Sequence, residues 1–191
     1  MKVLFVNSCL RKESRTERLC RMYLDKIKDE NTDIDFEIKE IKLQDIAMAP
    51  LTAEHLRERD ELAAKADFNN PYFALANEFA KADRIVIGAP YYDLQFPALL
   101  KIYLENVSVC GIAFKYNEQG IPVGLCNAKE LVYITTAGGY LGNFDFGYEY
   151  IKGLCQLFGI GKSREIKAEG LDIMGNDVEG ILQSVKEQEN L

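Results

Sequence analysis

The clearest indication of the fold is the run Val86-Ile87-Gly88-Ala89-Pro90-Tyr91-Tyr92-Asp93-Leu94-Gln95-Phe96-Pro97. Its first four residues predict a buried strand, which stops at Pro90. An aromatic loop follows, and Pro97 leads into a helix. In open α/β sheets, ligands bind in the crevice outside the carboxyl ends of the strands. A loop there with Pro90, Tyr91 and Tyr92 offers the backbone amides and flat faces that a planar heterocycle requires.

Short apolar runs alternate with longer amphipathic runs along the whole chain, which is typical of alternating strands and helices. Crossovers of this length make the strands parallel, with helices on both faces. The pattern predicts an α/β fold: a flavodoxin-like doubly wound five-stranded sheet with an inserted β-hairpin, in one domain over residues 1–191. The predicted strands are 3–6, 34–38, 85–89, 131–135 and 164–168, the hairpin is 114–125, and the predicted helices are 14–28, 54–66, 72–82, 98–109, 148–158 and 178–187.

The composition narrows the class of protein. The 191 residues are 48% hydrophobic and 28% charged, which is ordinary for a globular domain, and the net charge of −7 argues against a nucleic-acid surface. Five scattered cysteines without a C-x-x-C pair predict reduced thiols in the cytoplasm. The first apolar run, residues 3–6, is too short for a signal peptide, and no run reaches the ~20 residues of a membrane span. We therefore expect a cytoplasmic protein with neither a membrane nor a nucleic-acid partner.

The loop after the first predicted strand, residues 7–17, carries hydroxyls at Ser8, Ser14 and Thr16. Unpaired amides at the start of a helix form a ready anion site, and Arg11 or Arg15 would add donors to a phosphate. The alternative is that Ser14-x-x-Glu17 is only a capping box. Neither GxxxxGK[ST] nor GxGxxG is present, which disfavours an ATPase and a Rossmann dehydrogenase.

The loop after the fourth predicted strand contains Gly138 and Gly139, which permit close approach of the backbone to a flat ligand. A tight turn without a ligand is the alternative. Three such loops lie at the same end of a parallel sheet, and this coincidence favours a binding site. The single histidine, His55, sits in a charged helical run and is expected at the surface. No metal-ligand cluster and no GxSxG pattern is present, so we expect no metal and no serine hydrolase.

At these three loops the sequence resembles the FMN-dependent NADH-azoreductase and quinone reductase family of the flavodoxin-like superfamily. The resemblance runs over essentially the whole chain, including residues 89–94, 113–120, 136–139 and 169–171. It implies that the first loop holds the FMN phosphate, that the second borders the isoalloxazine ring, and that the third contacts the polar edge of the ring. The cofactor-binding residues implied in this way are Ser8, Ser14, Arg15, Thr16, Pro90, Tyr91, Tyr92, Asp93, Leu94, Thr136, Ala137, Gly138 and Gly139.

The resemblance also implies a mechanism. NADH or NADPH would reduce the flavin and leave, and a quinone or azo compound would then take two electrons in the same pocket. The cofactor performs the chemistry, so no catalytic side chain is expected. The family pattern often has Asn at Asp93 and Arg at Ala137, differences that bear on the flavin potential and the substrate range. A homodimer is expected by resemblance alone.

Two other functions fit the same residues. A flavodoxin-like FMN electron carrier would not oxidise NAD(P)H itself, and the net charge of −7 is compatible with its acidic rim. The second alternative is a regulatory domain that binds no flavin, since a fold does not determine a function. The hairpin at 114–125, with Tyr92 and Tyr140, favours an enclosed substrate pocket and therefore the enzyme.

Overall fold

A computed structural model describes all residues 1–191 and contains a five-stranded sheet and a separate two-stranded hairpin. The strand order of the larger sheet is β2-β1-β3-β6-β7, and all its neighbouring strands are parallel. The order reverses between β1 and β3, so the switch point lies between these two strands. The predicted flavodoxin-like sheet is confirmed. Its strands are β1 (Lys2–Asn7), β2 (Glu37–Lys42), β3 (Arg84–Gly88), β6 (Glu130–Thr136) and β7 (Lys162–Ala168).

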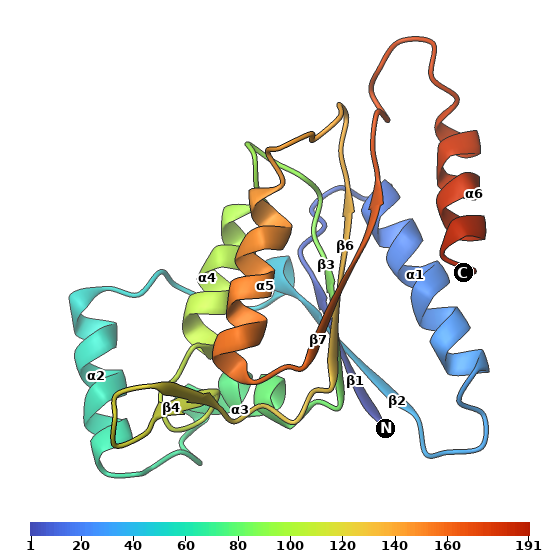
Figure 1. Ribbon diagram of the computed structural model, residues 1–191. Coiled ribbons are helices and arrows are strands. Elements are labelled where there is room, and N and C mark those ends of the chain that lie inside the picture. The colour runs from blue at the N-terminus through green and yellow to red at the C-terminus, as the bar shows by residue number, and fades with distance from the viewer.

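The helices cover both faces of the sheet, as predicted. Two lie on one face, α1 (Arg15–Asp29) and α6 (Val178–Gln188), as Figure 1 shows on its right-hand side. The opposite face carries α3 (Ala74–Lys81), α4 (Ala98–Val107) and α5 (Phe146–Phe158), while α2 (Ala53–Ala64) lies further out and buries no residue fully. Two short 3₁₀ turns, Leu43–Asp45 and Pro71–Phe73, precede α2 and α3. None of the helices is both long and apolar enough to cross a membrane.

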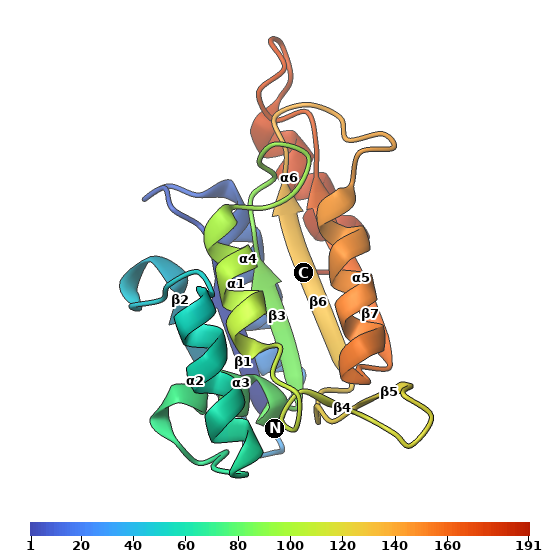
Figure 2. The ribbon, with the colours of Figure 1, turned by 90° about the vertical axis from the view of Figure 1, so that its left-hand side faces the viewer.

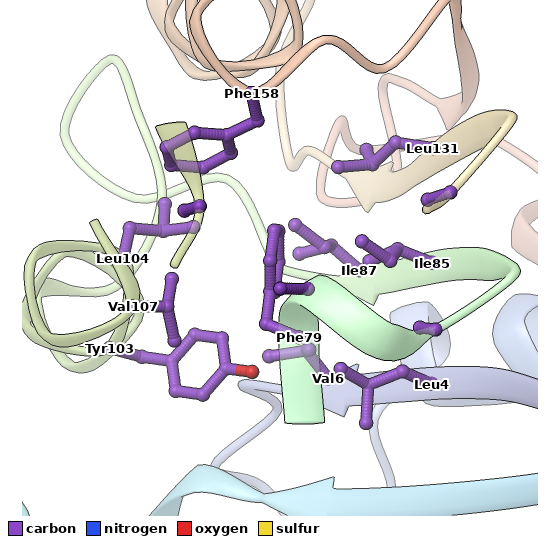
Figure 3. Close-up of a cluster of buried hydrophobic side chains, with 14 of the residues drawn as sticks. Leu4, Val6, Phe79, Ile85, Ile87, Tyr103, Leu104, Val107, Leu131 and Phe158 are labelled. Carbon is purple, nitrogen blue, oxygen red and sulfur yellow. The ribbon is translucent and has the colours of Figure 1, made fainter. Parts of the chain in front are cut away.

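The central strands are apolar on both faces because a parallel sheet is buried between two helical layers. Along β3, Ile85 and Ile87 face a core of 27 buried residues, and Val86 faces a core of 14 on the other side. Figure 3 shows the larger core, where Phe79 of α3 and Tyr103 of α4 pack beside β3. These two cores hold the strands rigidly, so the loops at their carboxyl ends start from fixed positions.

The second strand differs from the prediction. It was expected at 34–38, but β2 begins at Glu37 and ends at Lys42. Pairing explains the shift, because the register aligns Glu37 with Lys2, the first residue of β1. Residues before Glu37 therefore have no strand beside them, and Ile34 is 50% exposed. The alternation continues past the predicted end to Ile41, which is buried.

The predicted hairpin is confirmed, with β4 (Phe114–Tyr116) paired antiparallel to β5 (Pro122–Gly124). Its expected role in enclosing the pocket of this chain is wrong. The chain reaches the hairpin from α4, which runs back from the carboxyl edge, so the hairpin lies at the amino edge of the sheet. Figure 2 shows it below the end of α5, away from the loops that follow the strands.

Candidate functional site

The loops that follow β1, β3, β6 and β7 meet at one pocket of about 190 Å³. They lie at the top of Figure 1, the edge to which the strand arrowheads point. Sequence reasoning predicted three of these loops, and the structure adds the fourth, after β7. The pocket is lined by Leu10, Arg11, Glu13, Ser14, Arg15, Thr16, Pro90, Tyr91, Tyr92, Thr136, Ala137, Gly138, Leu171 and Asp172.

Ser14 is the N-cap of α1, and its Oγ accepts a hydrogen bond from the backbone N–H of Glu17 at 3.2 Å. The N-cap half of the capping box is therefore confirmed, whereas the Glu17 carboxylate accepts from Arg21 at 2.7 Å. It does not exclude anion binding, because the same hydroxyl keeps its proton for donation. The N–H groups of Arg15 and Thr16, at the first two helical positions, have no acceptor within the protein. The positive end of the helix and three donors thus face one pocket.

Hydrogen bonds between loops fix the shape of the pocket. Thr16 Oγ1 lies 2.7 Å from Thr136 Oγ1, which joins the first loop to the end of β6. The Tyr91 N–H donates to the Thr136 carbonyl at 3.0 Å, which joins the second loop to the same residue. Thr136 therefore connects all three predicted loops through hydrogen bonds of the protein itself.

The fourth loop is joined to the third by backbone hydrogen bonds. Leu171 N–H donates to the Ala137 carbonyl at 3.1 Å, and Asp172 N–H donates to the Gly138 carbonyl at 2.9 Å. Arg15 Nη1 reaches across the pocket and donates to Leu171 O at 3.1 Å and to Asp172 Oδ1 at 2.7 Å. Asp172 was missed by sequence reasoning, although its place just after the fifth strand of a parallel sheet could have indicated it.

Four of the predicted residues do not line the pocket. The side chain of Ser8 is fully buried, and its Oγ donates to the Gly88 carbonyl at 2.9 Å, so this hydroxyl holds β1 to β3. Gly139, Asp93 and Leu94 lie outside the lining as well. The other nine predicted residues are brought together, along with Arg11, which the sequence had indicated as a possible donor.

The loop after β3 contains a tight turn in an uncommon conformation. Tyr92 and Gln95 exchange two backbone hydrogen bonds, of 3.1 and 2.9 Å. The two residues between them have positive φ, 47° at Asp93 and 71° at Leu94. This conformation is usual for Asn-Gly and costly for leucine. Such local strain is often found at binding sites, where the surrounding structure holds it.

The charges in the pocket are mixed, with Arg11 and Arg15 beside Glu13 and Asp172. Cys9 lies in the first loop, and burial raises the pKa of its thiol to about 11. The thiol therefore stays protonated near neutral pH and does not act as a nucleophile. The cysteines are all unpaired, as predicted.

A second group of charges lies between β7 and the start of α5. Lys167 Nζ is 3.1 Å from Asp145 Oδ2 and 3.4 Å from Glu165 Oε2. Burial, and then the nearby Asp145, raise the pKa of Glu165 to about 7. The group is connected to the pocket through Phe144, the residue before Asp145, because the Phe144 carbonyl accepts a hydrogen bond from Tyr91 OH at 3.0 Å. None of the three charged residues lines the pocket.

The fold and the pocket together define a flavodoxin-like protein whose crevice, at the switch point of the sheet, suits an anion joined to a flat group. The model of a family described as having the flavodoxin-like fold matches residues 1–190. An FMN-dependent NADH:quinone oxidoreductase of Clostridium beijerinckii is 34% identical over 95% of this chain and 92% of its own length. The chain belongs to this flavodoxin-like family and, within it, to the FMN-dependent NADH:quinone oxidoreductases, which makes it an oxidoreductase.

Solved structures show the same fold. An azoreductase from Bacillus anthracis superposes with a TM-score of 0.86 at 22% identity, covering 98% of this chain and 95% of the other. An FMN-dependent NADH-azoreductase from the same species, in complex with FMN, superposes with a TM-score of 0.83 at 20% identity, with 98% and 95% covered. Since sequence identity is low, these two structures bear on the fold alone.

Proposed function

We propose that this chain binds FMN in the pocket and uses it to pass two electrons from NADH to quinones or azo compounds. The name of the Clostridium beijerinckii relative supports the cofactor and the electron donor, and the azoreductase structures share the fold. One observation supports this pocket as the FMN site. The unpartnered N–H groups of Arg15 and Thr16 and the Ser14 hydroxyl face the same pocket as the aromatic loop after β3.

The residues present fit such a cofactor. A phosphate is bound by amides at a helix start, by hydroxyls and by guanidinium groups, and Ser14, Arg15 and Thr16 offer all of these. Pro90 and Tyr91 offer a flat, apolar wall without charge. Thr136, Ala137 and Gly138 line the same pocket. When bound, FMN would supply the two-electron chemistry, and the protein would position and shield it.

No side chain of this chain is proposed as a catalytic acid or base. Ser14 and Arg15 would hold the phosphate, and Thr16 would keep the first loop against Thr136. The wall at Pro90, Tyr91 and Tyr92 would keep water from one side of the ring. We propose that NADH and the electron acceptor use this pocket in turn, as in a ping-pong mechanism. We propose NADH as the donor, and NADPH is the alternative for the assay to exclude.

We further propose that residues 1–191 act as one domain, that the protein works in the cytoplasm, and that two copies pair over the pocket. A volume of about 190 Å³ is smaller than the roughly 300–1,000 Å³ of sites that enclose a whole ligand. Aromatic side chains at the rim are exposed, Tyr140 by 71% and Phe144 by 56%. A second chain over this rim would bury them and complete the cover. Sedimentation of the FMN-loaded protein tests this, and a monomer at micromolar concentration would contradict it.

The activity is tested by separating the two halves of the reaction. FMN-loaded protein is mixed with NADH without oxygen or acceptor, and flavin absorbance is followed. We expect bleaching by NADH and recovery of the colour when a quinone is added, with saturating turnover in the steady state. A flavin that NADH does not bleach, but that dithionite does, would instead identify the electron carrier. Equal rates with NADPH would overturn the preference for NADH.

A further inference from the structure

The guanidinium of Arg15, which lies in the proposed phosphate site, already contacts an anion of the protein itself. Its Nη1 donates to Asp172 Oδ1 at 2.7 Å and to the Leu171 carbonyl at 3.1 Å. The other two guanidinium nitrogens donate to no protein acceptor. Both side chains line the pocket, with 38% of Arg15 and 69% of Asp172 exposed. The ion pair is therefore accessible to a ligand that enters the pocket.

The position of Asp172 is set by its own loop. Its N–H donates to the Gly138 carbonyl at 2.9 Å, which fixes the backbone against the third loop. Its carboxylate lies close to Gly138, since a Cβ on that glycine would come within 2.5 Å of Asp172 Oδ2. The lack of a side chain at position 138 thus leaves room for a carboxylate at the wall opposite the start of α1.

A carboxylate at this wall lowers the affinity of the pocket for a phosphate ligand. A phosphate monoester carries nearly two negative charges at neutral pH, and like charges repel most strongly where water is partly excluded. The phosphate would also compete with Asp172 for the Arg15 donors. The pocket already contains Glu13, so its two arginines are balanced by two acids. An affinity set by Ser14, Arg15 and the helix amides would be higher without Asp172.

We propose that Asp172 is a positioning residue that weakens binding of the FMN phosphate by competing for Arg15, and so keeps the cofactor exchangeable. This inference rests on the proposed function of the pocket. It also couples the cofactor to the fourth loop, because a phosphate that takes over Arg15 releases residues 171–172 from α1. The stretches of sequence that carry the family resemblance end at Leu171 and do not include this carboxylate.

The test compares Asp172→Asn with the wild type in titrations with FMN and with riboflavin, followed by quenching of flavin fluorescence. The variant keeps the size of the side chain and removes its charge. We expect FMN to bind about three- to tenfold more tightly, as for one exposed like charge beside a dianion. Riboflavin has no phosphate, so its affinity should not change. Added salt should reduce the gain for FMN because it screens the repulsion.

A matched control is available on the same face of the molecule. Glu179 pairs with Arg18 at 2.7 Å, and its side chain is 69% exposed, the same values as for the Asp172 pair. Neither Glu179 nor Arg18 lines the pocket. Glu179→Gln should therefore leave both flavin affinities unchanged. Far-UV circular dichroism and the unfolding midpoint of both variants establish that they are folded.

Each result decides the inference. Tighter FMN binding by Asp172→Asn alone supports it, since a general structural defect would not raise an affinity. Unchanged or weaker FMN binding, or an equal gain for riboflavin, would overturn it and leave the FMN site intact. A gain of the same size in Glu179→Gln would show a bulk charge effect and would also overturn it. A wild-type chain that binds neither flavin would refute the proposed function, and this inference with it.

Discussion

Ser14 combines two roles that a sequence pattern presents as alternatives. Its oxygen caps α1 by accepting from Glu17 N–H, and its proton remains for a ligand in the pocket. Thr52 caps α2 in the same way, accepting from His55 N–H at 3.3 Å, but it lies outside the pocket. A comparison of the two caps therefore separates the effect of a capping hydroxyl on stability from its effect on ligand binding.

Ser14→Ala and Thr52→Ala should each lower the free energy of unfolding by about 1 kcal/mol, the usual effect of losing an N-cap hydroxyl. Only Ser14→Ala should also weaken FMN binding, by about tenfold, because a hydrogen bond to a charged phosphate is lost. Denaturant unfolding and flavin titration measure the two effects. Equal FMN affinity in both variants would remove Ser14 from the phosphate site.

Leu94 has a φ of 71° and a side chain that is 47% exposed. Left-handed backbone costs a non-glycine residue about 1–2 kcal/mol, whereas glycine adopts it freely but loses about 0.5–1 kcal/mol of chain entropy. Leu94→Gly should thus be as stable as the wild type or up to about 1 kcal/mol more stable. Leu10 is equally exposed, at 45%, and has no positive φ, so Leu10→Gly should destabilise. Thermal unfolding compares them, and equal losses would refute the strained turn.

Glu165 gives the protein a pH dependence of known sign. Its pKa rises from 4.5 to about 7 in the folded chain, chiefly through burial and then through Asp145. Between pH 4.5 and about pH 7, the Glu165 carboxyl is ionised in the unfolded chain and protonated in the folded chain. Its contribution to the free energy of unfolding therefore falls as the pH rises through this window. Glu165→Gln should gain about 1–2 kcal/mol relative to wild type between pH 5 and pH 8. The exposed Glu118→Gln should show no such change in urea unfolding, and parallel curves for all three proteins would contradict the assignment.

The place of a residue at the start of a helix or the end of a strand could be predicted from the sequence, whereas its contacts with distant residues could not. Ser14 and Tyr91 stand where a helix starts and where a strand ends, which sequence shows directly. Ser8 also has a hydroxyl and lies in the same loop as Ser14, but only the fold reveals that this hydroxyl donates to the Gly88 carbonyl. Asp172 is 157 positions from Arg15, and nothing local indicates that the two meet.

At the scale of elements, the sequence predicted each helix and strand of the sheet, and the errors have physical causes. The start of β2 depends on where β1 begins, which hydrophobic alternation does not contain. The hairpin was recognised from its turn, but its place depends on the direction of α4. A local pattern thus predicts the type of element, while its partners and its end of the sheet come from the topology.

The hairpin is held by a contact between two glycines at the end of α5. A Cβ at Gly124 would lie 2.0 Å from the backbone nitrogen of Gly159, so no side chain fits there. Gly124→Ala should lower the free energy of unfolding by about 1–3 kcal/mol, as for overpacking. Gly153→Ala, in α5 with open space around it, should raise it by up to about 1 kcal/mol.

Both glycine variants should bind FMN as the wild type does, because the hairpin lies at the amino edge and the pocket at the carboxyl edge. Unfolding curves and flavin titrations on the same samples test this. Loss of FMN affinity in Gly124→Ala, with the fold retained, would instead show that the hairpin contributes to the FMN site.

At the scale of the whole molecule, the strand order brings four loops to one edge, and their cross-links form the pocket. Thr136 holds the first and second loops, and the fourth is attached through Ala137 and Gly138. Cross-links of this kind restrict the loops, and restricted loops lose less entropy when a ligand enters. Composition and alternation predicted this architecture because they report on burial, which a doubly wound sheet requires of every central strand.

Binding of FMN to the cofactor-free protein shows whether the four loops form a flavin site. Flavin fluorescence is titrated with the chain, and the unfolding midpoint is recorded with and without excess FMN. We predict saturable quenching at one FMN per chain and a stabilisation of about 2.7 kcal/mol when free FMN is 100 times its Kd. Fluorescence that the folded protein does not quench, with a midpoint that FMN leaves unmoved, would contradict it.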